Sequence, residues 1–183
     1  STKKAELLGR HYLVIGIVQG VGFRPFVYKL ANSYGVKGDV RNTTRGVEIN
    51  AFASEAALQR LESGIRSQAP GLSRIDKIQV VDIPIEINDS FRIIASISQE
   101  GEFQPIPADI AICQECKAEI LDPANRRFHY AFNNCINCGP RFTIINDLPY
   151  DRYNTAMNSF VMCPDCQAEY DDPGNRRYHA QPT

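Results

Sequence analysis

The apolar residues of the first hundred positions follow two different spacings, and each change of spacing predicts a new element. Short β-branched or alternating runs, which are typical of strands, occupy the segments 11–18, 36–42, 47–53, 75–83 and 91–97. The sequence TTRG between the second and third runs contains a glycine and predicts a hairpin turn. These runs therefore predict a sheet in the first half of the chain.

Helical spacing follows the first and the third of these runs. From Pro25, apolar residues recur every three or four positions, and Gly35 is placed to end that helix. Ser54 is placed to cap a second helix. The order β-α-β-β-α-β, with one more strand at the end, predicts an α+β fold of the ferredoxin-like plan, in which both helices cover one face of an antiparallel sheet.

All six cysteines lie between Cys113 and Cys166, which indicates two modules with different sources of stability. We expect a first domain at 1–97, a proline-containing linker at 98–110 and a cysteine-rich region at 111–183. That region repeats itself at a spacing of 50, because CQECKAEILDPANRRFHY from residue 113 aligns with CPDCQAEYDDPGNRRYHA from residue 163.

The first copy of this repeat contains two cysteine knuckles and predicts a finger at 113–138. The spacing C-x2-C-x18-C-x2-C of Cys113, Cys116, Cys135 and Cys138 is typical of zinc sites, because four thiolates complete a tetrahedron. A closed set of four sulfurs leaves no position for a catalytic water, so we expect a structural zinc ion. Reduced cysteines in a core and a redox pair are the alternatives.

The second copy, at 163–183, contains only Cys163 and Cys166. Cysteines equivalent to the second knuckle would fall at 185 and 188, which favours an N-terminal fragment that ends inside its second finger. Alternatively, His179 joins the two cysteines as a zinc ligand. The DPANRRF and DPGNRRY loops are expected to shape the fingers rather than to bind RNA.

Charge and hydropathy limit the classes of partner. The net charge is −1 and neither half is strongly basic, so we do not expect nucleic acid to bind. No apolar run reaches the roughly 18–20 residues of a membrane span, and the first ten residues lack the apolar core of a secretory signal. We expect a cytoplasmic protein with reduced thiols.

The sequence VQGVGFRPF, at 18–26, joins the first predicted strand to the first helix. The N–H groups at a helix N-terminus are unpaired, and glycines allow them to converge on an anion. Arg24 would add a planar, charged fork. By spacing alone, a phosphate site and a plain turn with a surface arginine are both open. The candidate phosphate-binding residues are Gln19, Gly20, Val21, Gly22, Phe23 and Arg24.

The stretch GIVQGVGFRPFV at 16–27, followed by VRNT at 40–43, resembles the acylphosphatase family over about the first 95 residues. This resemblance implies that the loop and Arg24 hold a phosphate and that Asn42, otherwise an ordinary turn residue, positions the attacking water. It also implies a reaction without metal and without a covalent intermediate. Phosphoryl transfer of this kind needs mainly positioning and charge stabilisation.

The acylphosphatase-like module and tandem fingers, with CGPRFTIINDLPYDR at 138–152 and RRYHAQPT at 176–183, resemble the N-terminal region of HypF, the carbamoyltransferase of nickel-iron hydrogenase maturation. The resemblance implies hydrolysis of carbamoyl phosphate to carbamate and phosphate. It places ATP use in domains absent from this chain, which transfer the carbamoyl group to a HypE-type acceptor for cyanide synthesis. The alternative is a non-catalytic, zinc-dependent scaffold that docks those domains or a HypE-type partner.

Overall fold

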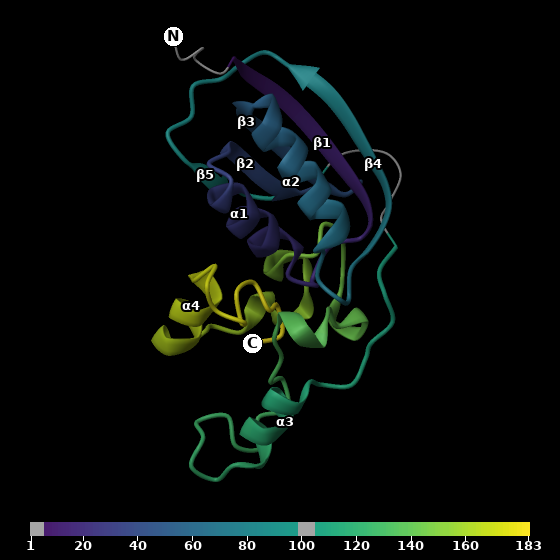
Figure 1. The fold of residues 1–183 in the computed structure, drawn as a ribbon. Helices are drawn as coiled ribbons and strands as arrows, with labels where there is room; N and C mark the ends of the chain where they lie inside the picture. The colour runs from purple at the N-terminus through teal and green to yellow at the C-terminus, as the bar shows by residue number, and fades with distance from the viewer. Residues whose placement is uncertain (1–5, 99–104) are drawn as a thin grey trace.

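The computed structural model describes residues 6–98 and 105–183, so part of the expected 98–110 linker and the first five residues lie outside the described residues. Figure 1 shows a sheet with two helices on one face and, beside one end of this layered module, a less regular region that contains α3 and α4. We call residues 105–183 the finger region. The two parts are in direct contact, and this contact shapes the site described below.

The sheet has the strand order β4-β1-β3-β2-β5. The strands are β1 (Leu7–Ile17), β2 (Lys37–Asn42), β3 (Val47–Ser54), β4 (Arg74–Ile83) and β5 (Phe91–Ile93). Strand β1 pairs antiparallel with β3 and β4, β2 pairs antiparallel with β3, and β5 runs parallel to β2. The α+β, ferredoxin-like fold predicted from the apolar pattern is confirmed.

Strand β5 is shorter than the run 91–97 that the sequence predicts. It ends at Ile93, although the chain continues beside β2, where the N–H group of Ile97 donates to the carbonyl of Asn42. Residue Thr43 forms an isolated bridge with Ile97. This segment therefore lines the end of β2 that carries Asn42 without forming a continuous ladder.

Helices α1 (Phe23–Ser33) and α2 (Glu55–Ser67) cover one face of the sheet (Figure 1). Helix α1 begins two residues before Pro25, so Arg24 belongs to its first turn. The Ser54 hydroxyl caps α2 by accepting from the N–H group of Ala57. The apolar faces of both helices bury against the sheet, which supplies the main stabilisation of this module. The deeply buried side chains of this module include Tyr12, Val14, Phe23, Val27, Ile49, Leu58, Leu61 and Ile65.

The finger region contains two short helices that the apolar pattern did not predict, α3 (Gln114–Leu121) and α4 (Pro164–Asp171). Each begins directly after a cysteine, and the sulfurs of Cys113 and Cys163 accept the N–H groups of Cys116 and Cys166 at the helix start. The repeat therefore encodes a cysteine knuckle that caps its own helix. Four 3-10 turns occupy Ile136–Cys138, Phe142–Ile144, Arg152–Asn154 and Ala156–Ser159.

The two repeats exchange arginine side chains. Arg127 of the first repeat pairs with Glu169 of the second, and Arg177 of the second pairs with Glu119 of the first. Both arginines are buried. The two arginines occupy equivalent positions of the two repeats, 50 residues apart, and so do the two glutamates. The NRR loops thus shape the region, as expected, but they do so by crossing to the other repeat. No helix in the described parts of the chain is both long and apolar enough to span a membrane.

Candidate active site and metal centre

The loop between β1 and α1 has the backbone geometry of an anion nest. Gly20 and Gly22 adopt left-handed conformations with φ of 71° and 77°, whereas Val21 between them does not have a positive φ. Gly22 is also the N-cap of α1. Alternation of left- and right-handed residues turns successive N–H groups toward one point, and the helix start adds its partial positive charge.

Arg24 is buried, with 7% of its surface exposed, and its guanidinium contacts the finger region. Nη2 donates to Oδ1 of Asp151 at 3.2 Å and to Nδ1 of His179 at 3.0 Å. Nη1 reaches the hydroxyl of Ser96 at 3.4 Å. Two of the side chains that hold this arginine, Asp151 and His179, thus follow it by more than 120 positions.

Asn42 is fully buried at the end of β2, and neither its amide nitrogen nor its amide oxygen has a hydrogen-bond partner among the described residues. Such unpaired groups are costly unless they serve a ligand or a water. Asn42 faces a cavity of about 20 Å³ that Arg24, Gly20 and Gly22 also line. A space of this size accommodates a water molecule, and Asn42 and Arg24 both line it.

Gln19 ties the glycine loop to its surroundings. Its side-chain nitrogen donates to the carbonyl oxygens of Thr43 at 2.7 Å and of Gly46 at 3.2 Å. Its side-chain oxygen accepts the N–H group of Tyr150 at 3.0 Å. Because the Gln19 side chain is committed to this tether, only its backbone is left to hold an anion.

The finger region closes over the glycine loop. A Cβ atom on Gly20 would lie 2.7 Å from Pro140 and 2.8 Å from the ring of Tyr150, and one on Gly22 would lie 3.0 Å from Ile136. The glycines therefore permit the close approach of the finger region. Ile136, together with Tyr178 and His179, completes the wall of the small cavity.

His179 lies at this boundary and not at the second knuckle. Its ring stacks on Tyr178 and Tyr170, with centroid distances of 4.2 and 4.9 Å. Burial, followed by the charge of Arg24, lowers the pKa of His179 to about 3. The imidazole is therefore neutral at neutral pH, and its Nδ1 accepts a hydrogen bond from the Nη2 group of Arg24. Within residues 6–98 and 105–183, His179 forms no metal-ligand group with Cys163 and Cys166.

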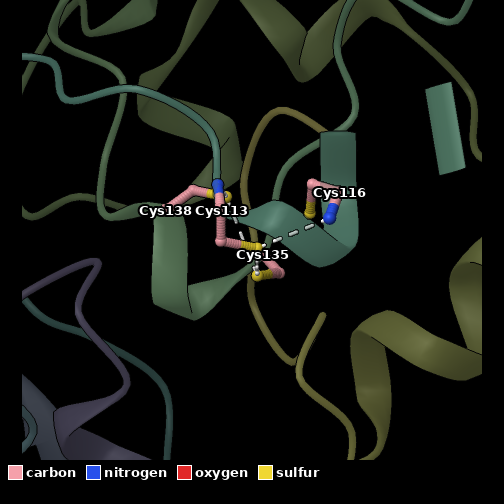
Figure 2. A group of neighbouring side chains, drawn as sticks. All are labelled: Cys113, Cys116, Cys135 and Cys138. Atoms are coloured by element: carbon pink, nitrogen blue, oxygen red, sulfur yellow. Dashed lines mark hydrogen bonds between the residues drawn. The ribbon is translucent and has the colours of Figure 1, made fainter. Parts of the chain in front are cut away.

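The four cysteines of the first finger converge on one point (Figure 2). Their sulfurs all lie within 4.8 Å of one another, with separations of 3.7 Å from Cys113 to Cys135 and 3.8 Å from Cys135 to Cys138. Tetrahedral coordination with Zn–S bonds of about 2.3 Å places sulfurs ~3.8 Å apart. Cys116 is fully buried, like its partners Cys135 and Cys138. The donor set therefore fits zinc.

The second knuckle is more open. Cys163 is exposed, and Cys166 is half-buried. Arg126 of the other repeat donates to the sulfur of Cys166 at 3.2 Å, as Arg176 donates to the sulfur of Cys116 at 3.1 Å. Arg126 also reaches the sulfur of Cys163 at 3.8 Å. Arginines of each repeat thus contact cysteine sulfurs of the other, although only the first repeat gathers four thiols.

Comparisons with known proteins match both parts of the chain. The acylphosphatase family model matches residues 10–93, and the HypF finger model matches 112–145 and 162–183. An acylphosphatase of Bifidobacterium longum is 40% identical over 84 residues, which are 45% of this chain and 86% of that protein. The chain belongs to the acylphosphatase family, and its second module is a HypF finger.

Longer HypF proteins contain both modules. Carbamoyltransferase HypF2 of Cupriavidus necator is 48% identical over 149 residues, which are 80% of this chain and 18% of that protein. A crystal structure of full-length HypF in the phosphate- and nucleotide-bound form matches with a TM-score of 0.90 and 43% identity, over 100% of this chain and 24% of that one. The chain carries the acylphosphatase and finger domains of HypF and spans about a fifth of such relatives.

Several residues around Arg24 and its cavity could not be assigned to this place from the sequence. Asp151 and His179 contact Arg24, while Ile136 and Tyr178 line the cavity, and all four belong to the finger region. No local spacing links them to the glycine loop. The repeat itself suggested His179 as a metal ligand, because a histidine near a cysteine knuckle is typical of zinc sites.

Proposed function

We propose that this chain hydrolyses carbamoyl phosphate to phosphate and carbamate at the cavity between Arg24 and Asn42. The observation that carries this proposal is the fully buried, unpartnered amide of Asn42 beside a buried arginine and a glycine nest. A buried polar group without a partner is retained where a ligand or a water satisfies it. A bound phosphate and a water molecule would together satisfy the Asn42 amide and the free donors of Arg24.

The proposed reaction uses these groups for binding and orientation. The N–H groups of the loop from Gln19 to Phe23 and the Arg24 fork hold the phosphate oxygens and stabilise their charge. The Asn42 amide positions a water in line with the bond to the leaving group. As the water oxygen bonds to phosphorus, the bond from phosphorus to the carbamate oxygen breaks, so carbamate departs and phosphate remains. No metal and no enzyme nucleophile is needed at this site.

The identity of the substrate rests on the relatives that share the finger region. These HypF relatives are named carbamoyltransferases. In a longer HypF-type protein, the carbamate would be used by ATP-dependent domains and a HypE-type acceptor. We expect other acyl phosphates to react more slowly.

We also infer that a structural zinc ion is bound by the first finger. The ligands would be Cys113, Cys116, Cys135 and Cys138, whose sulfur separations support a tetrahedral site. Such an ion would supply folding energy to a region with few buried apolar side chains. For the second knuckle, Cys163 and Cys166 remain candidate ligands whose further partners are open.

A phosphate-release assay with carbamoyl phosphate tests the enzyme. Arg24→Ala and Asn42→Ala should each lower kcat/KM about 100-fold or more, as loss of a charge-stabilising group commonly does. Matched controls are Arg74→Ala on exposed β4 and Asn32→Ala on the outer face of α1, which should retain activity. Activity that survives both site substitutions would refute the proposed mechanism.

A non-catalytic scaffold is the second candidate function. It is supported by exposed apolar side chains of the finger region, where the rings of Tyr130, Phe132 and Phe160 lie near one another and Val161 is almost fully exposed. A scaffold predicts no phosphate release from the folded, zinc-loaded chain, together with binding to separately expressed ATP-binding or transferase domains of a HypF-type protein. The phosphate-release assay therefore separates the two candidates.

A further inference from the structure

The contact between Arg24 and the finger region has a use beyond holding two modules together. We propose that Asp151 and His179 are positioning residues of the acylphosphatase site, which fix the Arg24 guanidinium for the phosphate. This inference rests on the proposed function of the cavity. It makes the finger region a part of the site and not only its neighbour.

The hydrogen-bond inventory of Arg24 leaves room for a phosphate. A guanidinium has five N–H groups, of which three reach Asp151, His179 and Ser96. The two that remain are available to an anion in the cavity that Arg24 lines. Protein acceptors on three sides therefore fix the orientation of the fork without using all of its donors.

Asp151 is well placed to act as a fixed acceptor. Only 7% of its surface is exposed, and it precedes the 3-10 turn Arg152–Asn154. Its N–H group donates to the carbonyl of Pro149 at 2.8 Å, and its carbonyl accepts the N–H group of Asn154 at 2.9 Å. The Asp151 carboxylate is therefore attached to a backbone that is itself held on both sides.

His179 is fixed just as firmly. Its backbone is left-handed with φ of 51°, its N–H group donates to the carbonyl of Tyr170 at 3.1 Å, and its ring is stacked on Tyr170 and Tyr178. Because Nδ1 of the neutral ring is an acceptor, it accepts a second hydrogen of Arg24 Nη2. These contacts direct the His179 side chain toward Arg24 and not toward the sulfurs of Cys163 and Cys166.

Positioning matters at this site because phosphoryl transfer depends on the placement of charge. A misplacement of about 1 Å can cost ~100-fold in rate, and a free arginine would lose much side-chain entropy on binding phosphate. The alternative role for Asp151 is competition, in which its carboxylate takes the place of a phosphate oxygen on Arg24. The two roles predict opposite changes in phosphate affinity.

The test compares Asp151→Ala, Asp151→Asn, His179→Gln and His179→Asn in the zinc-loaded chain. The readouts are the affinity for inorganic phosphate by calorimetry and KM and kcat for carbamoyl phosphate. Asp151→Ala and His179→Gln should weaken phosphate binding and raise KM about tenfold, as expected for loss of a charge-assisted hydrogen bond. Asp151→Asn and His179→Asn keep an acceptor at the right position, and should stay within about threefold of the parent protein.

Matched controls separate positioning from general damage. His129→Gln makes the same change at the equivalent position of the first repeat, where φ is 58° and the ring stacks on Phe128. Asp147→Asn removes a carboxylate whose oxygen accepts a nearby backbone N–H group. Both controls should leave phosphate affinity unchanged. A purely structural role would lower kcat by reducing the folded fraction while KM and phosphate affinity stay constant.

Tighter phosphate binding in Asp151→Ala would overturn the positioning role and indicate competition. Unchanged affinity in both Asp151→Ala and His179→Gln would also overturn it. If the parent chain binds phosphate but releases none from carbamoyl phosphate, the proposed enzyme fails, whereas the order of phosphate affinities still decides the role of Asp151 and His179.

Discussion

Glu119 of the first finger repeat accepts hydrogen bonds from Arg177 of the second, so one carboxylate holds the two repeats together. Burial alone would raise its pKa, but hydrogen bonds from Asn133 and Arg176 and the nearby arginine charges lower the pKa of Glu119 to about 2. The carboxylate therefore stays ionised and paired throughout the physiological pH range. The reciprocal pair, Arg127 with Glu169, repeats the arrangement in the opposite direction.

Glu119→Gln should destabilise the finger region, because it removes the nearer carboxylate of buried Arg177 and leaves only Glu169, 3.9 Å from its Nε. We expect a loss of about 2 kcal/mol in the free energy of unfolding, less than the ~3–5 kcal/mol of a fully buried pair because Glu119 is partly exposed. Urea unfolding of the zinc-loaded chain measures it. Glu115→Gln is the control, since Glu115 is largely exposed and 3.9 Å from Arg176. Equal losses in both variants would contradict the prediction.

Gly22→Ala should weaken both the fold and the contact with the finger region. The new Cβ would lie 3.0 Å from Cδ1 of Ile136, and the positive φ of 77° adds backbone strain. Gly35→Ala carries similar strain, with φ of 68°, but nothing lies within 4 Å of its Cβ. We expect a loss of about 1–2 kcal/mol of stability from strain in each variant, with an additional loss only in Gly22→Ala.

A double-mutant cycle isolates that additional loss. In the variant that combines Gly22→Ala with Ile136→Ala, the clash is removed, so the coupling free energy should exceed about 0.5 kcal/mol in the favourable direction. Thermal or urea unfolding of the four proteins gives this value. Additive effects would mean that the two modules are not packed against each other at this loop.

The strands and helices of the sheet module could be predicted because short-range sequence signals determine where they begin and end. The apolar runs, the Ser54 cap and the glycine after α1 each act within a few residues, and the structure follows them closely. Strand β5 is the exception. Its apolar run beyond Ile93 touches β2 only at isolated points, because edge pairing depends on the neighbouring strand and not on the run itself.

The completed site could not be predicted, because its parts are brought together only by tertiary packing. Arg24 and Asn42 followed from the family resemblance, but Asp151 lies 127 positions beyond Arg24 and has no motif of its own. Helices α3 and α4 escaped prediction because they are short and have little apolar periodicity, and their start is a cysteine cap. The ion pairs of Arg127 and Arg177 could not be predicted either, because an arginine in one repeat does not indicate which glutamate of the other repeat it contacts.

Zinc removal should unfold the finger region while the sheet module persists. Structural zinc contributes about 10–16 kcal/mol in finger peptides, and the apolar cluster around the four thiols includes few other side chains. Hydrogen exchange of the chelated chain should show loss of protection in 105–183 and retention in β1 and β3. Cys113→Ser should lose the tightly bound ion, whereas the equivalent Cys163→Ser should keep it, because Cys163 lies outside the four-thiol group.

The stability of the folded chain should decline as the pH falls, and His179 sets the window. Its pKa is about 3 in the folded chain, owing first to burial and then to the charge of Arg24, against an ordinary value of 6.5. Above pH 6.5 both folded and unfolded states hold it neutral, so it contributes no pH dependence. Between pH 6.5 and 3 the unfolded state takes up the proton, and stability is lost progressively.

At pH 5 this loss amounts to about 2 kcal/mol, from 1.36 kcal/mol for each unit below 6.5. The titratable and charged groups near His179 are Arg24, Asp151, Tyr170 and Tyr178. Burial raises the pKa of both tyrosines, so neither of them titrates between pH 5 and pH 7. Unfolding free energies of the zinc-loaded parent and of His179→Asn, measured at pH 7 and pH 5, test this. Asparagine does not titrate and tolerates a left-handed backbone, so the variant should lose about 2 kcal/mol less between the two pH values. A parallel decline in the two proteins would show that His179 is not the group that titrates.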